Sequence, residues 1–352
     1  MLNRVKIDVY SYSYLKEDFF MIFNAFKIKD TKFKNRAVMP PMCMYSANEQ
    51  GEVNDFHIVH YGSRAIGGIG LIIQEATAVC PDGRITVNDL GIWKNRHVEG
   101  LKKIVDVVHM NGAAIGIQIN HAGRKARVEN PVGPSAITYG GDYKMPRELS
   151  VKDIKQVIED FKQAARRANE AGYDTLEIHG AHGYLIFQFL SPLSNHREDK
   201  YKDGKVFLRE ILEAVMQEWP KEKILILRVS AYEYVEGGVT PESISDAINY
   251  VKDLGLDLID VSSGGNVLVK IKAYPGYQLG LAKKVKELTG LPVIGGGLIS
   301  DLSLASHAIG SNSCDMVYFG RVLLREPYFM LNHASDLGYD IKFPDPYIRG
   351  KK

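Results

Sequence analysis

Cysteine is scarce in this sequence of 352 residues. The three thiols, Cys43, Cys80 and Cys314, are odd in number and widely spaced. That pattern excludes a disulfide framework and indicates a reducing compartment, so we expect a cytoplasmic protein.

Long apolar runs and an excess of one charge are missing as well. No run reaches membrane-spanning length, and charged residues break up segment 1–20, which excludes a secretory signal. The 44 Lys and Arg residues nearly balance the 42 Asp and Glu residues, for a net charge of +2. A surface that neutralises phosphates would need a basic excess, so we expect a soluble protein with neither a membrane nor a nucleic-acid partner.

Short apolar runs, by contrast, recur along the whole chain. Their nearly continuous apolar character is typical of parallel strands covered on both faces. Eight runs have this character: 35–42, 70–79, 113–120, 175–181, 224–230, 258–263, 292–297 and 314–320.

The segments between these runs carry helix signals. Ser150 and Asp153 form a capping-box pattern, and Gly172 follows where that helix should stop. Thr240 and Pro241 give a second helix a cap and a first-turn proline. Strand and helix alternating eight times predict an α/β protein, a single-domain (β/α)8 TIM barrel, although a doubly wound sheet gives similar local signals.

In such a barrel the reactive groups lie where strands end and their loops begin. The residues at those positions are small or polar: Cys43, Ala76, Gln118, His179, Arg228, Ser263, Gly297 and Gly320. We therefore expect a ligand site at the carboxyl end of the barrel.

Arg228 is the most informative of these residues. An unpaired buried guanidinium costs several kcal/mol, more than neutral hydrogen bonds return, so Arg228 needs a partner. Two hypotheses remain open, namely an anionic or electron-rich ligand and an ion pair with Glu177 or Asp260.

The glycines Gly295, Gly296 and Gly297 weaken a strand, so something must require a bare backbone there. With Gly320 and Arg321 at the next strand end, they match the phosphate cradle that barrels build after strands seven and eight. Tight packing between helix and strand is the alternative for either segment.

His179 and His182 end the strand TLEIHGA, and Tyr184 follows them. Such donors suit a negative charge that develops on a substrate oxygen. Zinc is the alternative hypothesis, although this pair supplies only two of the three protein ligands that catalytic zinc usually has. A metal-dependent barrel hydrolase would need His121 as its third ligand.

Five segments carry a family resemblance: RAVMPPMCMYSA, GLIIQEATAV, IGIQINHAGRKA, LEIHGAHGYLIFQFLSPLSNHR and FGRVLLREP. They resemble the old yellow enzyme family of flavin oxidoreductases, in the bacterial branch that includes NADPH dehydrogenase and xenobiotic reductase. The resemblance covers residues 22 to 350. It implies non-covalent FMN, with NADPH or NADH as reductant and activated alkenes, quinones or nitro compounds as oxidants.

The resemblance also implies residue roles. Cys43 would tune the flavin, Gln118 would bind its pyrimidine side through the amide, and Arg228 would face its N1/O2 edge. His179 and His182 would bind the substrate oxygen, and Tyr184 would deliver a proton. The implied cofactor contacts are Pro40, Pro41, Met42, Cys43, Ala76, Gln118, Arg228, Gly297, Gly320 and Arg321. The implied substrate contacts are Tyr45, His179, Gly180, Ala181, His182, Tyr184 and Arg349.

The same resemblance implies a division of the chain into three segments. Residues 1–21 would be an N-terminal extension, disordered or an artefact of the start site, and residues 22–340 the FMN-binding barrel. Residues 341–352 would be a tail that offers Arg349 to a neighbouring subunit, which implies a homo-oligomer. The loop around 198–206 is shorter than is usual in the family. A barrel that binds the phosphorylated ligand without catalysis is the remaining alternative.

Overall fold

Eight parallel strands close into a barrel in the computed structural model, which describes residues 20–351. Each of the eight predicted runs contains one strand, and the last strand pairs with the first. The (β/α)8 prediction is therefore confirmed. In barrel order the strands are β3 (Ala37–Met39), β4 (Leu71–Ala78), β5 (Ala114–Asn120), β8 (Thr175–Gly180), β9 (Ile224–Ser230), β10 (Leu258–Ser262), β11 (Val293–Gly295) and β12 (Met316–Tyr318).

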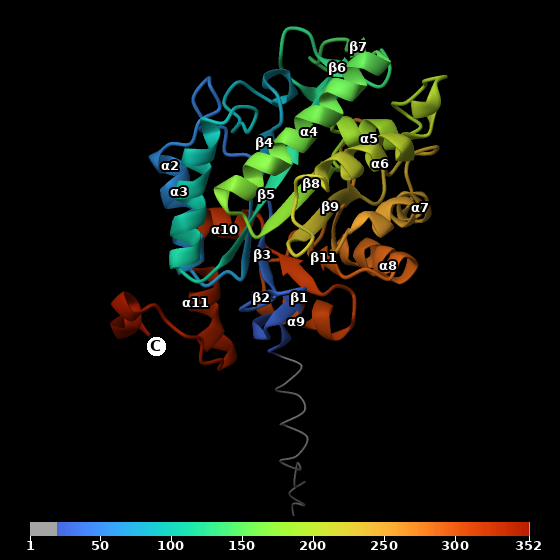
Figure 1. The fold of residues 1–352 in the computed structure, drawn as a ribbon. Helices are drawn as coiled ribbons and strands as arrows, with labels where there is room; N and C mark the ends of the chain where they lie inside the picture. The colour runs from blue at the N-terminus through green and yellow to red at the C-terminus, as the bar shows by residue number, and fades with distance from the viewer. Residues whose placement is uncertain (1–19, 352) are drawn as a thin grey trace, which may run out of the picture.

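Helices surround the barrel (Figure 1). Both predicted caps are present, because Ser150 accepts a hydrogen bond from the Asp153 amide and Thr240 accepts one from the Ser243 amide. Gly172 ends its helix in the left-handed region, at φ 91°. The helices are α2 (Asp55–Ile66), α3 (His97–Met110), α4 (Val151–Ala171), α5 (Leu185–Leu190), α6 (Gly204–Val215), α7 (Pro241–Val251), α8 (Leu279–Thr289), α9 (Leu302–Gly310), α10 (Arg321–Arg325) and α11 (Phe329–Ala334).

Two pairs of very short strands lie outside the barrel and were not predicted. The hairpin of β1 (Phe26–Ile28) and β2 (Thr31–Phe33) packs Phe33 against barrel residues at the amino-terminal end. The parallel pair β6 (Val132–Gly133) and β7 (Arg147–Glu148) lies before α4. Neither pair lies in a continuous apolar run like those that contain the barrel strands, so the apolar pattern did not reveal it.

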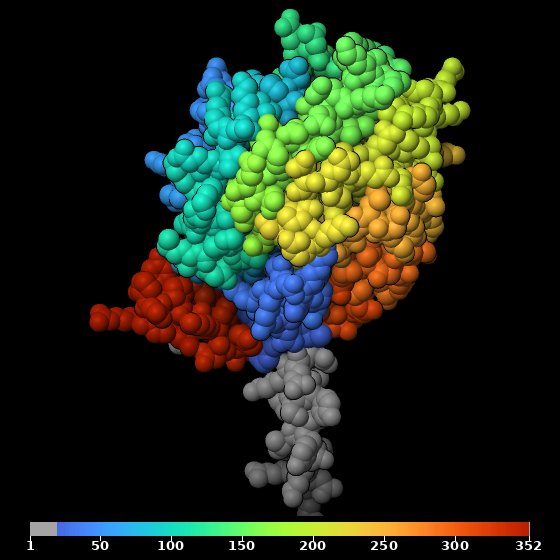
Figure 2. All heavy atoms as spheres, viewed as in Figure 1, coloured from blue at the N-terminus to red at the C-terminus, as the bar shows by residue number. Residues whose placement is uncertain are grey.

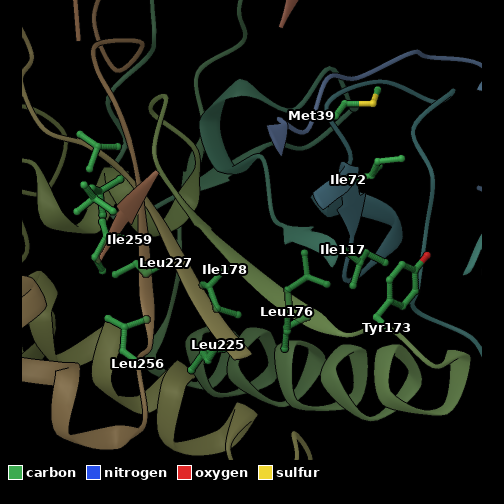
Figure 3. Packing of buried hydrophobic residues seen from close by; sticks show 14 of the residues in the cluster. Met39, Ile72, Ile117, Tyr173, Leu176, Ile178, Leu225, Leu227, Leu256 and Ile259 are labelled. Carbon is green, nitrogen blue, oxygen red and sulfur yellow. The ribbon is translucent and has the colours of Figure 1, made fainter. Parts of the chain in front are cut away.

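Side chains of the barrel strands alternate between two apolar clusters. Leu176, Ile178 and Leu225 belong to the larger cluster, between the strands and the helices (Figure 3). Ile224, Ile226 and Leu258 belong to the smaller cluster inside the barrel. The inward positions nearer the carboxyl end are instead polar and buried: Gln118, Glu177, His179, Arg228 and Asp260.

The C-terminal segment lies at the other end of the barrel, beside the first described residues (Figures 1 and 2). Phe23 stacks on Tyr339 with their ring centroids 4.2 Å apart. Among residues 20–351 no helix is both long and apolar enough to cross a membrane. Residues 1–19 of the predicted N-terminal extension lie outside the described part of the chain.

Candidate active site at the carboxyl end of the barrel

Arg228 lies in a buried polar layer at the carboxyl end of the barrel. Its Nε is 3.0 Å from Oδ2 of Asp260, on the neighbouring strand. The ion pair that the sequence left open is therefore present. Burial opposes the charge, but the Asp260 carboxylate beside it raises the pKa of the guanidinium, so Arg228 stays a cation.

Arg228 also lines a cavity that could hold a ligand. A cavity of about 350 Å³, within the size range of small-molecule sites, lies at this end of the barrel. It is lined by five predicted cofactor contacts, Met42, Arg228, Gly297, Gly320 and Arg321, together with Ser262, Tyr277, Gln278, Leu298, Ile299, Ser300, Tyr318, Val322 and Arg325. Residues from five separate strands (β3, β9, β10, β11 and β12) or the segments that follow them thus meet at one cavity, and three of its lining residues are arginines.

The glycines differ in why each is a glycine. A Cβ on Gly295 would lie 3.0 Å from Ala282, and one on Gly296 would lie 2.7 Å from the Tyr318 ring, so packing explains both. Gly297 has φ +102°. A Cβ on Gly320 would meet nothing closer than 3.8 Å, and its φ is −84°. Packing does not require a glycine at Gly320, and the open space beside it allows the close approach of a ligand.

His179 and His182 lie side by side, with ring centroids 5.2 Å apart. The Ala181 amide donates to Nδ1 of His179, at 3.3 Å. In a neutral imidazole the proton then sits on Nε2, which becomes the donor. Ala181, a predicted substrate contact, thus contributes its backbone amide here. Gly180, another predicted contact, packs closely against the next strand, because a Cβ on it would lie 3.0 Å from the Arg228 carbonyl oxygen.

His182 occupies a strained backbone conformation, at φ 57°. Its amide donates to Ser230 Oγ at 2.9 Å, and its Nε2 lies 2.8 Å from Ser262 Oγ. The Nζ of Lys125 donates to the carbonyl oxygens of His182 and Gly265, at 2.9 Å each. Residues from three strand ends therefore hold this histidine in place.

Lys125 is a site residue that the sequence reasoning missed. Its ammonium also lies 5.0 Å from the centroid of the Tyr184 ring. Burial lowers the pKa of Lys125 to about 8. The available signal was its position in the loop after a barrel strand, where reactive groups of such barrels lie.

Both histidines are neutral at ordinary pH. Burial is the main reason that their pKa values lie well below 6.5, and the charges of Arg228 and Lys125 lower them further. Neutral imidazoles can donate a hydrogen bond without placing another cation beside Arg228.

Tyr184, Cys43 and Ala76 meet in a small apolar cluster beside the histidines. The Tyr184 ring lies edge-on to His179, with centroids 4.8 Å apart. Burial raises the pKa of Tyr184 well above 10, and it raises that of Cys43 as well, so both side chains keep their protons. Tyr45 is 47% exposed and strained at φ 52°. Of the two predicted prolines, Pro40 is buried and Pro41 is partly exposed, just before Met42.

Two predicted residues lie elsewhere. His121 uses Nδ1 to accept a hydrogen bond from the Gly123 amide, and within residues 20–351 no three His, Cys, Asp or Glu side chains gather as metal ligands. The hydrolase alternative is therefore not supported. Arg349 belongs to the C-terminal 3-10 turn Asp345–Gly350, and the preceding residues 342–346 line a hollow at the amino-terminal end of the barrel. It is remote from the site of its own chain.

Comparison with known proteins identifies the family. The model of the NADH:flavin oxidoreductase / NADH oxidase family matches residues 21–338. The chain belongs to this family.

Relatives of this flavin oxidoreductase include two NADPH dehydrogenases. That of Clostridium acetobutylicum is 50% identical over 335 residues, covering 93% of this chain and 98% of the relative. That of Bacillus subtilis is 46% identical over 338 residues, covering 94% and 98%. Morphinone reductase has a similar solved structure, with a TM-score of 0.78 and 26% identity, covering 92% of this chain and 91% of the other. The resemblance to old yellow enzymes is thus confirmed.

The buried histidine predicts a pH effect on the stability of this flavin oxidoreductase. Below pH 6.5 the unfolded chain binds a proton at His179 that the folded chain rejects, so stability falls as the pH falls. His179→Asn should reduce this slope by about 1.4 kcal/mol per pH unit below about pH 6. Urea unfolding between pH 5 and 8 measures it, and the exposed His196→Asn is the control. Equal slopes in wild type and His179→Asn would contradict the assignment.

Proposed function

We propose that this protein is an FMN-dependent NAD(P)H oxidoreductase, an NADPH dehydrogenase and ene-reductase that reduces activated alkenes. Quinones and nitro compounds are further oxidants. The observation that carries the proposal is the single cavity where Arg228, Gly297, Gly320 and Arg321 meet, beside the neutral pair of histidines. The names of the two bacterial relatives favour NADPH as the reductant.

The residues present fit FMN. Gly320 leaves open space where a Cβ would stand, and Arg321 and Arg325 line the same cavity, as a phosphate requires. Arg228 supplies a buried cation for the electron-rich edge of the ring. Met42, Cys43, Ala76 and Gln118 complete the set of residues that would hold it. FMN held there would supply hydride transfer between NAD(P)H and the substrate.

His179 and His182 bind the substrate oxygen. Nε2 of His179 carries the proton, because Nδ1 already accepts from the Ala181 amide. A hydrogen bond to the carbonyl oxygen of an enone withdraws electron density from the β-carbon, which favours hydride addition there. Because their pKa values lie well below 6.5, the two rings perform this role without changing charge near neutral pH.

Tyr184 supplies the proton that completes the reduction. Its hydroxyl keeps its proton because burial raises the pKa, and the ring is held between His179 and the Lys125 ammonium. Tyr45 is exposed beside this cluster and closes over the substrate. In this scheme the hydride goes to the β-carbon and the Tyr184 proton to the neighbouring carbon.

We also propose that the protein is a cytoplasmic homo-oligomer. The few unpaired thiols suit a reducing compartment. The tail lies far from the site of its own chain, so Arg349 serves as a substrate contact only in the site of a second subunit.

Phenol binding tests the role of the histidines. Each lost hydrogen bond to a ligand oxygen weakens binding by about tenfold, so His179→Ala with His182→Ala should weaken phenol binding by about 100-fold. Flavin content should stay nearly unchanged, and His196→Asn serves as the control. Spectral titration of the purified protein with a phenol measures both quantities. Loss of flavin with unchanged phenol affinity would contradict the assigned roles.

A further inference from the structure

Glu177 and Asp260 form a buried pair of carboxyl groups inside the barrel. Glu177 is 0% exposed and Asp260 is 1% exposed. Among the described residues, no side chain or amide donates a hydrogen bond of normal geometry to Oε2 of Glu177 or to either oxygen of Asp260. Arg228 Nε lies 3.0 Å from Oδ2 of Asp260, but this ion pair does not have the geometry of a hydrogen bond. Buried carboxylate oxygens without donors are costly, so the pair needs a proton of its own.

A single shared proton satisfies this arrangement. Two ionised carboxylates in one buried site repel each other, and burial together with the Asp260 charge raises the pKa of Glu177 well above 4.5. Asp260 has the Arg228 cation beside it, whereas Glu177 does not pair with it directly. The proton therefore resides on Oε2 of Glu177 and is shared with Asp260.

That location dictates what Gln118 does. With the proton on Oε2, the other oxygen of Glu177, Oε1, can only accept a hydrogen bond. Gln118 donates to it through Nε2, at 2.6 Å. The amide is thereby fixed with its NH2 group toward Glu177. Its carbonyl oxygen receives no hydrogen bond from the described part of the chain.

We propose that Glu177 is a positioning residue that locks the Gln118 amide so that its carbonyl oxygen accepts a hydrogen bond from an N–H group of the cofactor. This inference rests on the proposed function, in which the ligand is FMN and the donor is N3–H of its pyrimidine ring. The site thus selects its ligand by an N–H at that position. Arg228 on β9 and Asp260 on β10 carry the ionisable groups that act on Glu177.

The experiment compares FMN with N3-methyl-FMN, which lacks the N–H donor. The affinity of each for the apoprotein is measured by fluorescence titration. The wild-type protein should bind FMN about tenfold more tightly than N3-methyl-FMN, which is the effect of one hydrogen bond. Glu177→Met should weaken the binding of FMN by about tenfold and leave the binding of N3-methyl-FMN unchanged. The reason is that the Gln118 amide, no longer held by Glu177, does not keep its carbonyl oxygen toward the cofactor.

Two further variants keep the test decisive. Gln118→Met removes the acceptor oxygen and should weaken FMN binding by the same factor as Glu177→Met. Combining the two substitutions should weaken it no further. Glu177→Gln should restore the preference, since its carbonyl oxygen can accept from Gln118 while its NH2 group donates to Asp260. An unchanged preference in Glu177→Met, or an equal loss for both ligands, would overturn the inference. A wild-type protein that binds neither ligand would instead overturn the proposed function.

Discussion

Replacing Arg228 with methionine is expected to yield a protein that is purified without flavin and unfolds more easily. The change leaves Asp260 buried without its cation, and removing one partner of a buried pair costs about 3–5 kcal/mol. It also removes the cation that faces the cavity. Flavin absorbance per chain and urea unfolding measure the two effects separately.

Two variants separate charge from stability. Arg228→Lys keeps a cation and should retain part of the flavin, although a lysine cannot reproduce the planar guanidinium. Adding Asp260→Leu to Arg228→Met removes the stranded carboxylate and should restore stability but not flavin. An Arg228→Met protein with the flavin content of wild type would disprove the role of this residue.

Replacing Tyr184 with phenylalanine should slow alkene reduction by about 100-fold or more, the usual contribution of a general acid. The ring stays in place against His179 and Lys125, so only the hydroxyl is lost. Reduction of the enzyme by NADPH needs no proton from this residue and should keep its rate. Stopped-flow absorbance at the flavin band measures the two half-reactions in turn.

Tyr139 offers a matched control for that experiment. The Lys125 ammonium lies 4.5 Å from its ring centroid, so Tyr139→Phe removes a second hydroxyl beside the same cation. Its rates should equal those of wild type. If Tyr184→Phe slowed both half-reactions equally, another group would have to be the proton donor.

The sequence predicted the strands that position the site, because these strands follow from local patterns. Apolar runs of strand length and two well-formed helix caps located the strands, and the strand ends then located Gln118, His179 and Arg228. Gln118, His179 and Arg228 lie within both the predicted runs and the observed strands, so they needed no knowledge of long-range contacts. The short hairpin that contains Phe33 has no such pattern, and it was missed.

Contacts between separate strands could not be derived in this way. Whether Arg228 pairs with Asp260 depends on the register of β9 and β10, which only the closed barrel fixes. The glycine run illustrates the same limit, because Gly296 packs against Tyr318 from the next strand whereas Gly297 lines the cavity. Lys125 reaches two carbonyl oxygens that are far apart in the chain, and no local pattern marks it.

The central claim is that one FMN binds where Arg228, Gly320 and Arg321 meet. Titration of the apoprotein with FMN and with riboflavin, which lacks the phosphate, tests it most directly. We predict saturation at one FMN per chain and binding of riboflavin weaker by about 100-fold, because charge-assisted hydrogen bonds to the phosphate are lost. Equal affinity for both compounds, or no saturable binding of FMN, would contradict the account.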